Sequence, residues 1–408
     1  MGQAKNRWLE QQELGFNAPG WRHVCDECVA DYALKHLVRS HAAEPTCDFC
    51  DRTSDKPIAA DADTVLEHIG RSINLEWADP VGLLIFDKED DRWVGRVLDF
   101  EEVLAEEFMW PFANERFERF TVDAFSESQW TEVDPGGLNE AEALQFSWEL
   151  FAETVKHKAR FLFALLDEEG MSDEPGASLR RRGEMLIEIG NLVNKYDLIT
   201  VFSAETPLFR AKVHSSGQSY TTARDLGTPP ADKARQSRMS PAGIPMFYGA
   251  EEADGALAET VDWSRASGKI ATIASFQART EFRVVDLDRL NDVPSIFDHR
   301  PAARRDRPSL GFMHGFRREV SRPIERDDRI HIEYVPTQAV TEYFRHLFRD
   351  NEGRSVDGFA YESTRAPGRR NVVLFVDNDH CLERDEREPV LDGLVLEIHG
   401  RERRRVSE

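Results

Sequence analysis

The sequence predicts an α+β protein made of several parts: a small cysteine-rich N-terminal region, a helical middle and a C-terminal domain with a mainly antiparallel sheet. Three observations predict this organisation. Four of the five cysteines lie within the first 50 residues. Apolar residues follow a helical period from about residue 60 to residue 200, and short β-type runs take over after that point. A chain of 408 residues is long enough for two or three domains.

Composition excludes several classes of protein. Hydrophobic residues make up 40% of the chain and charged residues 31%, so there is enough apolar material for packed cores and wholesale disorder is excluded. No apolar run approaches the ~20 residues that span a bilayer. The first residues lack the apolar core of a secretory signal, so we expect a cytoplasmic protein without membrane contact. The formal net charge of −23 argues against general nucleic-acid binding.

Two Cys-x-x-Cys pairs form the strongest local pattern. Cys25 and Cys28 make the first pair, and Cys47 and Cys50 follow after eighteen residues. Two such pairs close a tetrahedron of thiolates around Zn²⁺ and leave no open position for water. We therefore predict a structural zinc on these four cysteines, with a short helix over residues 29–37 between the pairs. His36 and His41 are expected on the surface, and the lone Cys381 is not expected to act as a nucleophile.

The middle of the chain predicts an acidic helical domain. Residues 51–200 carry about −19 of the net charge. Helices are expected over residues 60–73, 100–108 and 139–169 and from Ser178 onward, with three tryptophans in the core: Trp110, Trp130 and Trp148. A ribonuclease of the HEPN type would need an arginine four to six residues before a histidine on one helix, and neither His68 nor His157 has one. A scaffold or interaction bundle is therefore preferred.

The C-terminal part predicts an α+β domain that tolerates anionic ligands. Residues 201–408 carry a net charge of only about −2 and are rich in arginine. Strands are expected over residues 198–202, 269–273, 282–287, 330–335, 371–376 and 394–398, and helices over residues 253–263 and 337–348. No Walker A loop, Gly-x-Gly-x-x-Gly turn or Gly-x-Ser-x-Gly elbow is present, so kinase, dehydrogenase and α/β-hydrolase activities are excluded.

A series of short sequence motifs characterises this part of the chain. They are Pro207–Ala211, Arg238–Ala250, Gly255–Thr260, Tyr334–Gln338, Asp357–Ser363 and Asn371–Phe375. In this order they resemble the RES domain, a family named for an Arg, a Glu and a Ser. Those positions fall on Arg210, Glu259 and Ser363, and the resemblance covers roughly residues 200–385. The N-terminal part is similar to the zinc-containing HEPN/RES-type region that precedes some RES domains.

The resemblance implies an NAD-degrading toxin with a fold similar to ADP-ribosyltransferases. Arg210 and Arg238 would bind the pyrophosphate, because a guanidinium is a planar, bidentate donor. Glu259 would stabilise the positive charge that builds on the ribose as the nicotinamide–ribose bond breaks. Ser363 would orient the ribose or the amide. Two tyrosines, Tyr248 and Tyr361, would stack on the nicotinamide or line its pocket.

The sequence departs from the family pattern after its second arginine. Met239 and Ser240 stand where an aromatic residue and an asparagine are usual. Arg224 and Arg235, in the polar loop over residues 215–235, are therefore alternative ligands for phosphate.

These observations predict four segments and leave three functions open. The segments are a zinc-binding knuckle (residues 1–58), an acidic helical domain (59–198), a RES domain (199–385) and a C-terminal strand with a basic tail (386–408). The functions are an NAD glycohydrolase or its phosphorolytic counterpart, an ADP-ribosyltransferase that modifies a macromolecule, and a non-enzymatic interaction module with a decayed RES domain. A protein antitoxin or regulatory partner and a homodimer are further expectations.

Overall fold

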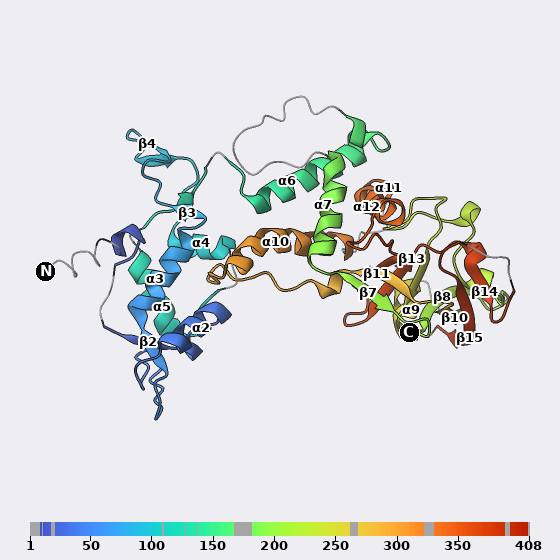
Figure 1. Ribbon diagram of the computed structural model, residues 1–408, viewed down its shortest axis with the longest axis horizontal. Coiled ribbons are helices and arrows are strands. Elements are labelled where there is room, and N and C mark those ends of the chain that lie inside the picture. Colours follow the sequence, from blue (N-terminus) through green and yellow to red (C-terminus); the bar gives the residue numbers. More distant parts are fainter. Residues whose placement is uncertain are drawn as a thin grey trace. The chain divides into compact units, whose positions relative to one another are not determined.

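The computed structural model describes residues 9, 11–17, 21–107, 110–126, 128–135, 137–166, 182–261, 268–321, 330–387 and 392–406. The chain forms two compact units (Figure 1), one of residues 1–140 with 292–308 and one of residues 141–291 with 309–408. Both contain helices and strands, so the α+β class is confirmed. The predicted division into four segments stays a prediction. Within the described residues, no helix is long and apolar enough to cross a membrane.

The first unit begins with the cysteine-rich region. Strand β1 (His23–Cys25) leads into a 3-10 turn (Asp26–Cys28) and helix α2 (Tyr32–His41). Asp31 starts this helix three residues later than predicted, because its carboxylate accepts hydrogen bonds from the amides of Ala33 and Leu34. Strand β2 (Ala59–Asp61) returns to pair with β1 in antiparallel register. His36 and His41 are exposed, as predicted.

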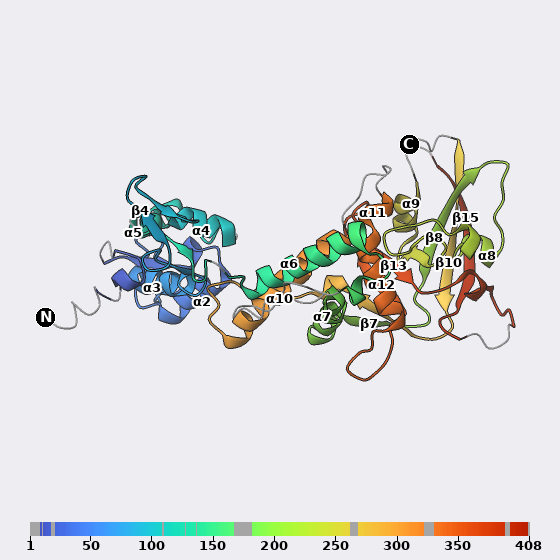
Figure 2. The same ribbon diagram turned by 90° about the horizontal axis from the view of Figure 1, so that it is seen from above.

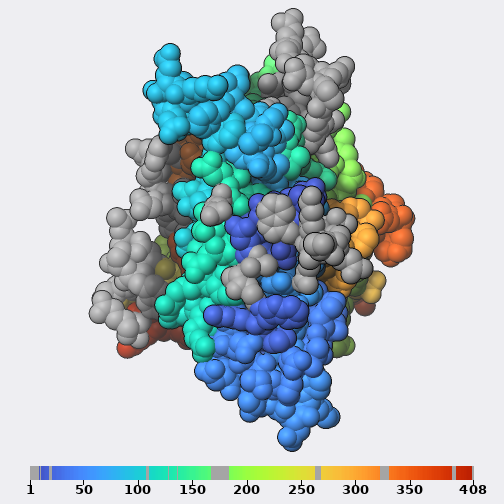
Figure 3. All heavy atoms as spheres, turned by 90° about the vertical axis from the view of Figure 1, so that its left-hand side faces the viewer, coloured from blue at the N-terminus to red at the C-terminus, as the bar shows by residue number. Residues whose placement is uncertain are grey.

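Helices and two small ribbons complete this unit. The helices are α3 (Ala62–Ile73), α4 (Phe100–Glu107) and α5 (Glu115–Phe125); β3 (Trp77–Ala78) pairs with β6 (Thr131–Glu132), and β4 (Ile85–Asp87) pairs with β5 (Arg92–Val94). The predicted face of α3 is confirmed, since Val65, Ile69 and Ile73 are fully buried. The space-filling view shows residues 80–95 at one end of this unit and residues 40–60 at the other (Figure 3).

One of the three predicted core tryptophans lies outside the core. Trp130 and Trp148 are each 3% exposed, whereas Trp110 is 36% exposed. Phe112 takes the buried position instead, where it bridges to Val29, and the Trp110 ring meets its edge. The prediction for Trp110 was therefore wrong, because two residues farther along the chain an aromatic side chain already fills that part of the core.

The second unit contains a helical layer that starts with α6 (Glu140–Glu153). The predicted long helix over residues 139–169 is shorter: a π-helical turn over Thr154–Lys158 follows α6, and Ala159 is extended. Residues 167–169 lie outside the described part. Helix α7 (Arg182–Lys195) follows, and the predicted start at Ser178 also lies outside the described residues. Trp148 donates to Glu319 and packs on Phe316, which ties α6 to helix α10 (Pro301–Ser321).

A nine-stranded sheet forms the body of the second unit (Figure 2). Its strands, in order across the sheet, are β14 (Cys381–Glu383), β15 (Leu396–Arg405), β10 (Lys269–Ala278), β8 (Leu208–Ser215), β9 (Phe247–Ala250), β13 (Arg370–Leu374), β12 (Gly358–Glu362), β11 (Phe282–Asp286) and β7 (Ile199–Phe202). Only β11–β12 and β14–β15 run parallel, so the prediction of a mainly antiparallel sheet is confirmed. Helix α9 (Ala253–Thr260) packs on β8, β9, β10 and β13.

The predicted strand over residues 330–335 is helical. Ile330–Glu333 form the single turn α11, and α12 (Val335–His346) follows directly. Alternation of apolar and polar residues over so short a run does not separate a strand from a helical turn. Pro336 fits the start of α12, because a backbone N–H in the first turn of a helix has no intrahelical partner and its absence costs nothing there.

We predict that Gly358→Ala destabilises the second unit. A Cβ atom at this position of β12 would lie 2.0 Å from the carbonyl oxygen of Val373 on β13. The two backbones would have to separate, at a cost of about 1–3 kcal/mol in the free energy of unfolding. Urea denaturation measures this loss. Gly217→Ala is the matched control, because nothing lies within 4 Å of its added carbon. Equal midpoints for the two variants would contradict the predicted close approach.

Candidate functional site

A pocket opens where two neighbouring strands of the sheet separate. Strands β8 and β9 pair only through Phe209 and Ala250. Beyond this pair, Arg210 of β8 and Tyr248 of β9 line a pocket of about 540 Å³, a usual volume for a small-molecule site. Helix α9 closes one side of the pocket with Glu259.

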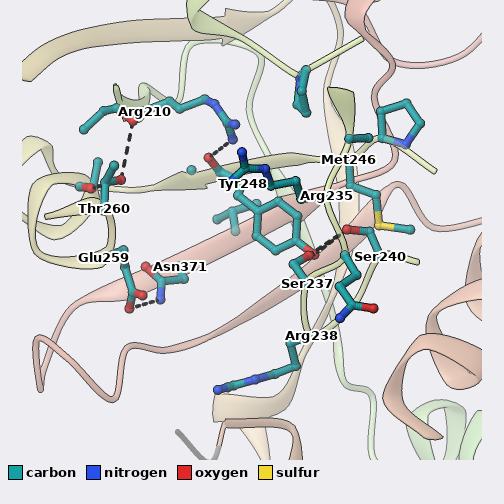
Figure 4. A pocket seen from close by; sticks show the side chains of 18 of the residues that line it. Arg210, Arg235, Ser237, Arg238, Ser240, Met246, Tyr248, Glu259, Thr260 and Asn371 are labelled. Carbon is teal, nitrogen blue, oxygen red and sulfur yellow. Dashed lines mark hydrogen bonds between the residues drawn. The ribbon is translucent and has the colours of Figure 1, made fainter. Parts of the chain in front are cut away.

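Arg210 occupies the place where the strand ladder stops (Figure 4). Its Nη1 donates to the carbonyl oxygen of Tyr248 at 2.7 Å, so the side chain replaces a backbone donor that a continued ladder would supply. The guanidinium also lies over the ring of Phe247, 5.7 Å from its centroid. Burial lowers the pKa of this guanidinium, yet arginine stays protonated. No carboxylate of the described residues forms an ion pair with it, so its charge is available to an anionic ligand.

The carboxylate of Glu259 is held through one of its two oxygens. Ser363 Oγ donates to Glu259 Oε1 at 2.5 Å, and Asn371 Nδ2 donates to the same oxygen at 2.8 Å. Both donors are almost fully buried, at 2% and 5% exposure. Ser363 Oγ in turn accepts from the backbone amide of Ala366 at 2.9 Å, which fixes its orientation. Oε2 accepts no hydrogen bond from these two donors and is left for a ligand.

A loop between β8 and β9 forms the opposite wall and is held by helix α12. Tyr248 hydrogen-bonds through its hydroxyl to Ser237 and, at 3.1 Å, to Ser240. Gln338 donates to the carbonyl oxygens of the same two serines. The motif Tyr334–Gln338 therefore stabilises this loop through Gln338, and Tyr334 itself lines the pocket.

Three tyrosines give the pocket flat apolar surfaces. Tyr248, Tyr334 and Tyr361 all line it. Burial raises the pKa of the Tyr248 and Tyr361 hydroxyls, so both phenols are uncharged at physiological pH. Neutral rings of this kind can stack on a planar heterocycle.

The pocket is strongly basic although the protein is acidic. Five cationic side chains line it, namely Arg210, Lys233, Arg235, Arg238 and Arg365, against the single carboxylate of Glu259. The chain as a whole has a net charge of −23. An excess of positive charge in one hollow of an acidic surface concentrates anions there.

The structure brings together the six side chains predicted for this site. Arg210, Arg238, Tyr248, Glu259 and Tyr361 line the pocket, and Ser363 is bonded to Glu259. Arg238 differs from expectation, because its Nη1 donates to the carbonyl oxygen of Val320 near the end of α10. Of the two alternative arginines, Arg235 lines the pocket and Arg224 lies beside Glu386 at 3.5 Å.

Sequence reasoning missed Asn371, Lys233 and Arg365. Asn371 belongs to the motif Asn371–Phe375. An asparagine at the start of an apolar strand nevertheless gives no local sign that it contacts a carboxylate 112 residues away. Lys233 and Arg365 stood in polar loops, where a surface position is the ordinary expectation for a basic residue. Only the fold shows that all three face one pocket.

The four N-terminal cysteines also converge, in the first unit. Their sulfur atoms all lie within 4.8 Å of one another. Three of the separations are 3.5 Å between Cys25 and Cys50, 3.6 Å between Cys28 and Cys47, and 3.8 Å between Cys25 and Cys28. Such a cluster can hold a metal ion.

Comparison with protein families finds two matches along the chain. Residues 40–169 match the HEPN/RES N-terminal domain 1, and residues 207–394 match the RES domain. Searches of curated proteins and of solved structures find no match. The RES domain is a family associated with NAD-utilising toxins, and its matched region contains every residue that lines the pocket. The chain therefore carries a RES domain, with the pocket inside it, preceded by a HEPN/RES N-terminal domain.

Proposed function

We propose that the pocket binds NAD and that the protein cleaves its nicotinamide–ribose bond. The observation that supports this most directly is the geometry of Glu259, a lone carboxylate in a basic pocket with both of its buried donors on one oxygen. A carboxylate in a pocket for an anion suits a substrate on which positive charge also develops. NAD meets both conditions: it carries an anionic pyrophosphate, and its ribose becomes cationic when the nicotinamide–ribose bond is cleaved.

Arg210 is the proposed anchor for the pyrophosphate. It lines the pocket without a carboxylate partner among the residues that the structure describes, and its hydrogen bond to Tyr248 orients the guanidinium. A guanidinium can give two parallel hydrogen bonds to phosphate oxygens while keeping this position. Arg238, from the loop of the opposite wall, is the second proposed donor.

Glu259 is the proposed stabiliser of the reacting ribose. As the bond between C1′ and the pyridinium nitrogen breaks, its electron pair stays on nicotinamide, which leaves as a neutral molecule, and the ribose becomes an oxocarbenium ion. A carboxylate fixed close to that ion lowers the barrier, because the site need not reorganise when the charge appears. A nucleophile then adds to C1′: water gives a glycohydrolase and phosphate gives a phosphorylase. Transfer to a macromolecular acceptor would use the same pocket.

We predict that Glu259→Gln slows NAD cleavage by about 10²-fold or more, because one charge facing the oxocarbenium in a dry site is worth about 3 kcal/mol. Shape and hydrogen bonding are kept, so the affinity for NAD stays close to wild type. Release of nicotinamide under single-turnover conditions measures the rate, and calorimetry measures the binding.

Arg210→Ala is the contrasting variant. Its anchor acts on the bound substrate and on the transition state alike, so KM rises as well as kcat falling. Arg210→Lys restores little, because an ammonium group cannot make a two-bond clamp. Turnover of NAD close to wild type by Glu259→Gln would show that the carboxylate has been assigned wrongly.

Asn371 is proposed to position Glu259 rather than to contact substrate. Asn371→Ala removes one charge-assisted hydrogen bond, worth about 1.5 kcal/mol, so we expect kcat to fall about tenfold. KM for NAD should stay within about twofold, because the pyrophosphate anchors are untouched. Asn191→Ala, on the exposed surface of α7, is the control. A rise in KM with unchanged kcat would instead assign Asn371 to substrate binding.

For the cysteine cluster, we propose a structural Zn²⁺. A tetrahedral ion with Zn–S bonds of about 2.3 Å separates its sulfur ligands by about 3.8 Å; three of the observed separations are 3.5–3.8 Å, and all lie within 4.8 Å. The backbone amide of Cys25 also donates to the sulfur of Cys47 at 3.3 Å, a contact that supports a thiolate. Four thiolates fill the coordination sphere, so the role of the ion would be to hold β1, α2 and β2 together.

Metal analysis of protein purified without added zinc should therefore find one Zn²⁺ per chain. Cys47→Ser should lose the metal and unfold the region around β1 and β2, because the free energy of metal binding is also free energy of folding. Cys381→Ser, which changes the cysteine outside the cluster, should keep one equivalent. Less than about half an equivalent in folded wild-type protein would contradict this assignment.

A further inference from the structure

The basic side chains of the pocket exceed what a pyrophosphate needs. A dinucleotide pyrophosphate brings about two negative charges, which two arginines neutralise. The lining offers five cationic side chains and one carboxylate. Three of the four arginines already use a nitrogen on a backbone carbonyl: Arg210 on Tyr248, Arg238 on Val320 and Arg365 on Glu259.

Lys233 and Arg235 remain without such contacts. Both are exposed on the loop between β8 and β9, Lys233 at the end of the 3-10 turn Ala231–Lys233 and Arg235 two residues later. Neither forms an ion pair or a side-chain hydrogen bond with any residue in the described part of the chain. Both nevertheless line the pocket, so two exposed cationic groups stand at its rim.

A third basic group shows that this positive charge is concentrated. Burial lowers the pKa of Lys212 on β8, the carboxylate of Asp225 opposes this shift, and the charges of Arg210 and Lys233 add to it. Lys212 itself donates to the backbone carbonyl oxygen of Asp225. Since Arg210 and Lys233 both act on this one side chain, their positive charges lie near the same end of the pocket.

The described lining residues also offer no second carboxylate that would exclude a phosphorylated ribose. Rossmann-fold sites selective for NAD place a carboxylate on the adenosine ribose, where it binds the 2′-hydroxyl and repels a 2′-phosphate. Among the described lining residues, the only carboxylate is Glu259, which Ser363 and Asn371 hold at the proposed nicotinamide end. A phosphate monoester carries about −1.5 to −2 charges at neutral pH, which two unpaired cations can balance.

We infer that Lys233 and Arg235 form a second phosphate subsite, and that the protein accepts NADP at least as well as NAD. This inference rests on the proposed function, and it extends the substrate class to 2′-phosphorylated dinucleotides. The proposed subsite binds a phosphate dianion. A free phosphate ion could supply the same chemistry, so the experiment has to separate the two sources.

The test compares NAD and NADP as substrates of the full-length protein in buffer without phosphate. We expect kcat/KM for NADP to equal or exceed that for NAD. Lys233→Ala and Arg235→Ala should each lower kcat/KM for NADP by about tenfold, mainly through KM, and change that for NAD by about twofold or less. Arg387→Ala, an exposed arginine of the same domain outside the pocket lining, should change neither.

Binding provides a readout that does not depend on turnover. Adenosine 2′,5′-bisphosphate should bind about tenfold more tightly than adenosine 5′-monophosphate, and Lys233→Ala should remove the difference. Cleavage of NAD with a kcat/KM for NADP more than tenfold lower would overturn the inference and leave the proposed function standing. Phosphate-stimulated NAD cleavage that Lys233→Ala abolishes, with NADP kinetics unchanged, would assign the subsite to free phosphate and overturn it too. If neither dinucleotide is cleaved, the proposed function fails, and equal binding of the two nucleotides would then overturn the subsite separately.

Discussion

The single pair of residues through which β8 and β9 meet is the constraint on which the site depends. A continuous ladder would bury this part of the sheet as ordinary core. Because pairing stops after Phe209 and Ala250, the next residues on each strand face a pocket, and a carbonyl of β9 needs a donor. Arg210 is that donor, so the group that closes a gap in the sheet also presents a positive charge to a ligand. Arg210 therefore has a structural role, its hydrogen bond to Tyr248, and a proposed functional role, the binding of an anion.

The carboxylate of Glu259 and the cationic side chains of the pocket are held by different hydrogen-bond partners, which keeps the two charges apart. Glu259 sits on α9 and is fixed by two buried donors that belong to β13 and to the turn after β12. The cations come mainly from β8 and the loop that follows it, and three of them donate to backbone carbonyls. No described ion pair joins Glu259 to the pocket cations, which keeps both signs of charge available. A substrate that is anionic in one part and becomes cationic in another during the reaction fits this separation.

The sequence predicted which side chains gather around one pocket better than it predicted the limits of the helices. Short motifs in a set order identified Arg210, Glu259 and Ser363. Such motifs keep their order in a family even where the loops between them differ in length. The predicted limits failed for α6, which gives way to a π-helical turn, and for residues 330–335, which form α11 and the start of α12. Asn371 and Lys233 could not be assigned from sequence, since their roles exist only once distant strands and loops meet. The spacing of the four cysteines, by contrast, already contained the geometry of their cluster.

The most direct test of the central claim is to follow the products formed from NAD by the purified full-length protein, using proton NMR. Cleavage at the nicotinamide–ribose bond predicts that free nicotinamide appears as fast as NAD disappears, together with ADP-ribose or its 1″-phosphate or an ADP-ribosylated acceptor. Persistence of NAD in the presence of folded protein would contradict the account. So would release of nicotinamide mononucleotide and AMP, because those products come from cleavage of the pyrophosphate rather than of the bond that Glu259 is proposed to face.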